Sequence, residues 1–147
     1  MLVVSDIHHA VAAVRHLVAR GQPLLILGDL VNLTDYRTGQ GVIADVLGLD
    51  FAVEVGEARA RGDYELMRRL WGAAVGRDDQ GFRTAMDEVI ARQYDDMAEA
   101  LTGATGYAIH GNVDRPELMK RALPEGIEYV HGETRNIGGR VLTIAIH

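Results

Sequence analysis

The sequence contains no cysteine, which excludes disulfide bonds, thiolate metal sites and cysteine nucleophiles. No apolar stretch approaches the roughly 18 residues of a membrane-spanning helix, because Asp, Glu or Arg interrupts each one. A basic segment followed by an apolar one, the mark of a secretory signal, is missing from the start of the chain. These absences predict a cytoplasmic protein without a membrane partner.

Motifs for several common chemistries are also missing. The chain has no Walker A loop, no G-x-G-x-x-G after a strand and no G-x-S-x-G. Its net charge of −6 argues against a nucleic-acid surface of the electrostatic kind and suits clustered carboxylates that hold metal cations. With 147 residues, 48% of them hydrophobic and 24% charged, the composition is that of one globular domain with a core.

The order of apolar runs predicts an α/β fold. Runs at 1–5 and 24–27 read as buried strands, and a helix over 10–20 joins them into a parallel βαβ unit. The middle, 42–103, shows three helical stretches and no strand, which predicts a helical insertion. The remaining predicted elements are a strand at 105–109, a helix at 116–123 and strands at 127–130, 134–137 and 140–146.

Polar residues follow three of the predicted strands. Asp6 and His8 come after the first, Asp29 after the second, and Asn112 and Asp114 after the third. Ligands bind at the carboxyl ends of strands in open α/β sheets, so we expect these side chains to converge. Carboxylate and amide oxygens with imidazole suit manganese, iron or zinc, and a carboxylate can bridge two ions about 3.5–4 Å apart.

In order, the motifs are D-x-H, G-D and G-N-x-D, and this arrangement resembles the metallophosphoesterase superfamily of calcineurin-like phosphoesterases. The family pattern is D-x-H, G-D, G-N-H-D/E, a lone H and G-H-x-H. The segment GDLVNLTDYR is also similar to bacterial members of unassigned substrate. The resemblance implies an α/β/β/α sandwich over 1–147, or its N-terminal half, with the helical insertion at 42–103.

The resemblance also implies a ligand set and a reaction. Asp6, His8 and Asp29 would bind one divalent ion, and Asp29 and Asn112 the other. A metal-bound hydroxide would attack the phosphorus of a small phosphate ester. Position 113 is valine where many members carry the histidine that assists the leaving group, which favours phosphodiester substrates.

The late family motifs are missing, since the sequence ends at His147 without a G-H-x-H. His147 is either the lone metal histidine or an ordinary residue at a strand end. Either the chain is the N-terminal portion of a longer protein or its partner half comes from elsewhere. We expect the chain alone to be deficient in its second metal and in turnover, and prone to form homo-oligomers through an uncovered apolar face. The alternative function is a non-catalytic interaction module that keeps the fold.

The candidates for catalysis are Asp114 and His9, each with a second interpretation. Asp114 could instead support the metal ligands or cap the helix that starts at Pro116. His9 could contact phosphate or be a solvated loop histidine. Of the remaining candidates, His16 is expected on the surface, His110 in packing or solvent, His131 at a strand bend, and Arg37 and Arg115 in solvent rather than on phosphate.

Overall fold

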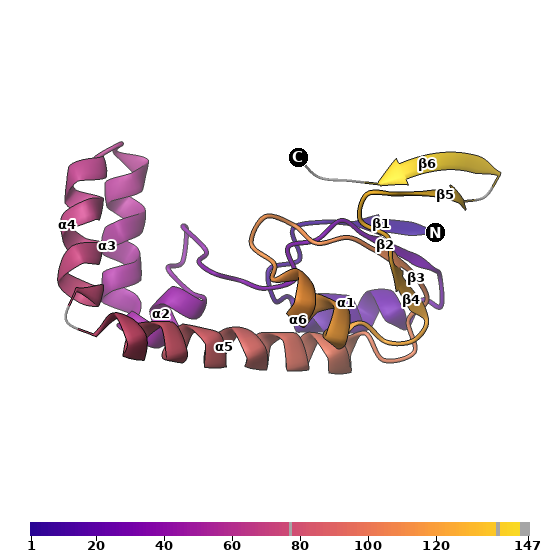
Figure 1. Cartoon of the computed structure of the whole chain (residues 1–147), viewed down its shortest axis with the longest axis horizontal. Coiled ribbons are helices and arrows are strands. Elements are labelled where there is room, and N and C mark those ends of the chain that lie inside the picture. Colours follow the sequence, from indigo (N-terminus) through magenta and orange to yellow (C-terminus); the bar gives the residue numbers. More distant parts are fainter. Residues whose placement is uncertain (77, 138, 145–147) are drawn as a thin grey trace. The chain divides into compact units, whose positions relative to one another are not determined.

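The structure, a computed structural model, describes residues 1–76, 78–137 and 139–144. Its main sheet has four parallel strands in the order β1-β2-β3-β4 (Figure 1). The chain is therefore a mixed α/β protein with a parallel sheet. The strands are β1 (Leu2–Val4), β2 (Leu24–Ile26), β3 (Gly106–Ala108) and β4 (Ile127–Tyr129).

Two helices form parallel connections, as the βαβ pattern predicts. Helix α1 (Val11–Val18) joins β1 to β2, and α6 (Pro116–Ala122) joins β3 to β4. Proline stands in the first turn of α6, where its missing N–H costs no hydrogen bond.

Strand β2 is buried on both faces of the sheet. Leu24 and Ile26 on one face are 1% and 0% exposed, and Leu25 on the other is 7% exposed. Burial on both faces explains why this strand reads as an unbroken apolar run rather than an alternation.

A separate two-stranded antiparallel hairpin follows the main sheet. It consists of β5 (Glu133–Ile137) and β6 (Arg140–Ile144). Ile144 of this hairpin shares a buried apolar cluster with three residues of the main sheet and its strand ends. Those three residues are Leu25, Ile109 and Val130.

The middle of the chain is helical, but its predicted division into three stretches is wrong. Between residues 42 and 100 the described residues form four helices, because Gly48, with φ of 93°, ends one helix and begins the next. The four helices are α2 (Val42–Leu47), α3 (Leu49–Ala60), α4 (Tyr64–Val75) and α5 (Asp79–Ala100).

The chain divides into two compact units. One consists of Met1–Val31 and Gln93–His147 and contains the sheet, and the other is Asn32–Arg92. The predicted insertion, 42–103, overlaps the second unit from 42 to 92. Within that unit Trp71 makes edge-on ring contacts with Phe51 at 5.2 Å and Phe82 at 6.1 Å. None of the helices in the described residues is both long and apolar enough to cross a membrane.

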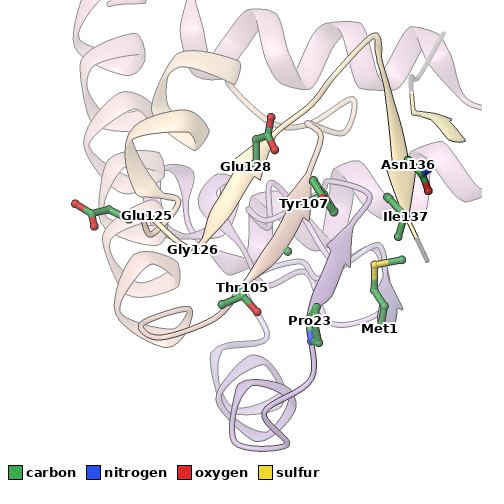
Figure 2. A pocket seen from close by; sticks show the side chains of 10 residues that line it. Met1, Pro23, Thr105, Tyr107, Glu125, Gly126, Glu128, Asn136 and Ile137 are labelled. Atoms are coloured by element: carbon green, nitrogen blue, oxygen red, sulfur yellow. The ribbon is translucent and has the colours of Figure 1, made fainter. Parts of the chain in front are cut away.

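A pocket of about 730 Å³ opens at the amino edge of the main sheet, where its strands begin (Figure 2). Met1, Pro23 and Thr105 line it from just before the first three strands. Figure 2 shows Met1 beside Ile137, and Glu125 pointing away from the other lining side chains. The predicted metal ligands lie at the opposite, carboxyl edge.

Candidate metal centre

The loops after β1 and β2 bring three predicted ligands together. Ligand atoms of Asp6, His8 and Asp29 all lie within 4.8 Å of one another. Donor atoms about 2.0–2.2 Å from one ion are at most about 4.4 Å apart. A small side-chain adjustment would therefore bring these three donors within reach of a single ion. The donor set, two carboxylates and one imidazole, fits a divalent transition metal.

The two ring nitrogens of His8 face different partners. Its Nδ1 lies 3.4 Å from the Val31 carbonyl oxygen, while its Nε2 lies 3.9 Å from Asp6 Oδ1. A histidine that donates one ring N–H to a backbone carbonyl presents its other nitrogen to a metal. The side chains of His8 and Asp6 are 44% and 70% exposed, so this ligand set is open to solvent.

Backbone strain is concentrated in these two loops. Among the described residues, the non-glycine residues with positive φ are Asp6 (51°), His8 (45°), His9 (59°) and Asp29 (55°). A left-handed conformation costs an L-residue roughly 1–2 kcal/mol, so the surrounding structure must hold each of them in place. Three of the four are predicted metal ligands.

Backbone hydrogen bonds hold the two loops together. The His8 N–H donates to the Asp29 carbonyl oxygen at 2.7 Å, and the His9 N–H donates to the Leu30 carbonyl oxygen at 2.8 Å. The loop that carries Asp6 and His8 is therefore fixed directly to the loop that carries Asp29.

The two motif glycines allow the third loop to approach. A Cβ on Gly28 would lie 2.0 Å from the Gly111 nitrogen, and a Cβ on Gly111 would lie 2.0 Å from Asp29 Oδ1. No side chain fits at either position. Glycine therefore lets the G-N-V-D loop contact the G-D loop, and the Val113 N–H donates to Asp29 Oδ1 at 3.3 Å.

Asn112, the predicted ligand of the second ion, belongs to this third loop. It directly follows Gly111, and its side chain is exposed. The loop thus places an amide side chain next to the segment that contacts the Asp29 carboxylate.

Asp114 is buried, with 9% exposure, and its carboxylate binds the ligand loops. Oδ2 accepts from the backbone N–H groups of Asp29 at 2.7 Å and Gly111 at 2.8 Å, and Oδ1 accepts from that of Leu30 at 3.0 Å. The prediction that Asp114 caps the helix is wrong, because the N-cap of α6 is Arg115. The carboxylate is instead turned towards the second and third loops.

Sequence reasoning missed Tyr94 of α5 as part of this site. The Tyr94 hydroxyl donates to Asp114 Oδ1 at 3.0 Å and accepts from the Arg115 N–H at 2.8 Å. Burial, and secondarily the negative charge of Asp114, raise the pKa of this phenol far above its usual value. In the sequence Tyr94 shows only as one apolar position in a helical stripe, and the stripe carries no signal of the hydroxyl contacts.

His9 is half-buried and contacts helix α5. Its Nε2 lies 2.9 Å from Asp96 Oδ2 on α5, and its side chain is 29% exposed. Asp96 was also missed, because an acidic residue on an exposed helix face forms no motif.

Two further histidines form a cluster apart from the three ligands. His110 shares a hydrogen bond with the Tyr129 hydroxyl, and its ring centroid lies 4.1 Å from that of His131. Burial, and then the nearby His131, lower the pKa of His110. The Nδ1 atom of His131 is buried without a hydrogen-bond partner in the described part of the chain. Of the two expected environments, packing and solvent, His110 is found in the first, packed against Tyr129 and His131.

The remaining candidate residues lie outside the group of three predicted ligands. His16 is exposed, and the Arg37 side chain is 91% exposed, as expected for surface residues. Arg115 is half-buried at the start of α6. His147 lies outside the described residues.

Comparisons of the chain with protein-family models, curated proteins and solved structures found no match. The functional interpretation of this centre rests on its own residues and their geometry.

Proposed function

We propose that the protein is a metal-dependent phosphoesterase of the metallophosphoesterase type that hydrolyses phosphate esters, with phosphodiesters preferred. The observation that carries this proposal is the convergence of Asp6, His8 and Asp29, from two strand ends, within 4.8 Å. These residues would hold one divalent ion, manganese, iron or zinc. Asp29 and Asn112 would hold the second.

The surroundings of the three ligands support a binding site rather than a chance cluster of acids. Strained residues persist only where other contacts determine them, and three of the four strained residues here are proposed ligands. Ions bound there would polarise the phosphate ester and lower the pKa of water. The chain's own contribution is to hold Asp6, His8 and Asp29 in position before substrate arrives.

Position 113 bears on the choice of substrate. The Val113 side chain has no proton to donate to a leaving group, although its backbone N–H donates to Asp29 Oδ1. General-acid help is worth roughly 10²–10⁴ in rate, and poor leaving groups lose most without it. Esters with good leaving groups, such as activated phosphodiesters, are therefore the favoured substrates.

Metal binding is tested first, with a matched pair of variants. The metal content of the protein is measured by elemental analysis after manganese loading and desalting. Asp29→Asn should lower manganese affinity by more than about 100-fold, since even outer partners of ligands are worth about 10–100-fold. Asp95→Asn, the same change at an exposed position of α5, should retain the metal. Equal metal content in both variants would contradict the proposed centre.

Turnover is tested separately. Bis(4-nitrophenyl) phosphate should be hydrolysed faster than an alkyl monophosphate in manganese buffer. A preference for the alkyl monophosphate would show that another group supplies the proton, and the argument from Val113 would fail. Metal uptake without hydrolysis of either ester would fit both the interaction module and the deficient turnover expected of the chain alone.

A further inference from the structure

Tyr94 joins helix α5 to the metal-binding loops through a buried hydroxyl. The residue is 3% exposed, and its hydroxyl both donates to Asp114 Oδ1 and accepts from the Arg115 N–H. Burial raises the pKa of this phenol further above the ordinary pH range, in which a tyrosine is already protonated and can donate. Asp114 thus receives a hydrogen bond from a segment that carries no predicted ligand.

The position of Asp114 in turn affects the ligand loops. Its two oxygens also accept from the backbone amides of Asp29, Leu30 and Gly111. One of these amides belongs to a predicted ligand, and another belongs to the glycine that precedes Asn112. A change in the orientation of this carboxylate would move the second and third loops relative to each other.

We propose that Tyr94 is a positioning residue for the metal centre, acting through Asp114 to set the separation of the Asp29 and Asn112 loops. The inference rests on the proposed function, because it assigns Tyr94 a role at that centre. Without the hydroxyl, Asp114 Oδ1 loses one donor and the Arg115 N–H loses its acceptor. The carboxylate then has more freedom to turn, and the ligand loops lose their fixed spacing.

Tyr94→Phe isolates this role, because it keeps the buried ring and removes only the hydroxyl. We expect the dissociation constant for Co²⁺, followed by visible absorption of the full chain, to rise about 10-fold, the lower end of the effect of groups that bind metal ligands directly. Tyr107→Phe is the matched control. Tyr107 is half-buried on β3 and lines the pocket at the opposite edge, so its Co²⁺ affinity should equal that of the wild type.

A general loss of stability is excluded with a second variant on the same helix. Ile90→Val trims a buried side chain of α5, 3% exposed, one turn before Tyr94. If Ile90→Val weakens Co²⁺ binding as much as Tyr94→Phe does, Tyr94 is only a packing residue and the inference is overturned. Co²⁺ binding by Tyr94→Phe equal to that of the wild type would also overturn it, while the proposed function would stand.

A readout without metal separates this inference from the proposed function. Amide hydrogen exchange at Asp29 and Gly111, whose N–H groups bind Asp114, should be faster in Tyr94→Phe than in wild type and Tyr107→Phe. Unchanged exchange would contradict the positioning role. Absence of Co²⁺ uptake by the wild-type chain would contradict the proposed function, and the inference would fail with it.

Discussion

At the carboxyl edge of the parallel sheet the loops carry Asp6, His8 and Asp29 in left-handed conformations, whereas the loops at the amino edge line an open pocket. At each edge a glycine lies in close contact with the backbone of a neighbouring segment. Gly28 lies against Gly111 at the first, and at the second a Cβ on Gly106 would lie 1.9 Å from the Leu24 carbonyl oxygen. The edges therefore share tight packing and differ in strain and in the side chains they present.

The difference shows where this chain holds costly backbone conformations. Among the described residues, all the non-glycine residues with positive φ lie in the two loops at the carboxyl edge. At the amino edge a glycine, Gly106 with φ of 134°, makes the close approach, beside strand pairing such as the Leu24 N–H donating to the Thr105 carbonyl oxygen at 2.8 Å. This concentration of strain at one edge supports the metal centre proposed there.

The carboxylates of the two edges differ in the same way. Asp114 is buried and accepts three backbone amides, whereas Glu128, which lines the pocket, is 53% exposed and pairs with the Arg135 guanidinium at 2.5 Å. That pairing raises the pKa of Arg135. Removing a carboxylate that is the hydrogen-bond acceptor of buried amides costs more free energy of unfolding than removing one in an exposed ion pair.

The largest expected effect is that of Gly111→Ala. The new Cβ would lie 2.0 Å from Asp29 Oδ1 and 2.5 Å from the Asp29 nitrogen, so the two loops must separate. We expect a loss of at least about 3 kcal/mol in the free energy of unfolding, measured by urea denaturation. Gly72→Ala in α4, where nothing lies within 4 Å, should instead stabilise slightly. Equal stability of the two variants would show that the loops do not touch as described.

A smaller effect is expected when the two carboxylates are made neutral. Asp114→Asn turns an amide group towards N–H donors, so we expect a loss of about 2 kcal/mol in the free energy of unfolding. Glu128→Gln should lose less than about 1 kcal/mol, as exposed ion pairs do. Thermal denaturation of both variants at neutral pH measures the two losses of stability. Similar losses from the two variants would remove the contrast between the edges.

The smallest effect is expected for Glu125→Gln at the amino edge. Glu125 is exposed and points away from the other pocket side chains (Figure 2), so its stability should stay within about 0.5 kcal/mol of the wild type. Its manganese content after loading should also equal that of the wild type. A loss of metal in this variant would show that the two edges are not independent.

Much of the fold follows from local patterns. Apolar runs at the first three strands of the sheet predict those strands, because each run is short and is followed by polar loop residues. The division of the helical middle was predicted less well, since a glycine between two amphipathic stretches can either interrupt a helix or be tolerated within it. Gly48 interrupts, and only its φ of 93° shows this.

For the candidate site, too, local sequence patterns predicted one part and tertiary packing decided the other. The sequence by itself determined which donors stand at the strand ends, since Asp6, His8 and Asp29 all lie within a few residues of the end of an apolar run. The tertiary structure alone decided the contact between the Tyr94 hydroxyl and the buried Asp114 carboxylate, which lie 20 residues apart in the chain. The physical reason is that a ligand's residue type is a local property, whereas a hydrogen bond between distant segments exists only after the sheet and helix α5 have packed together.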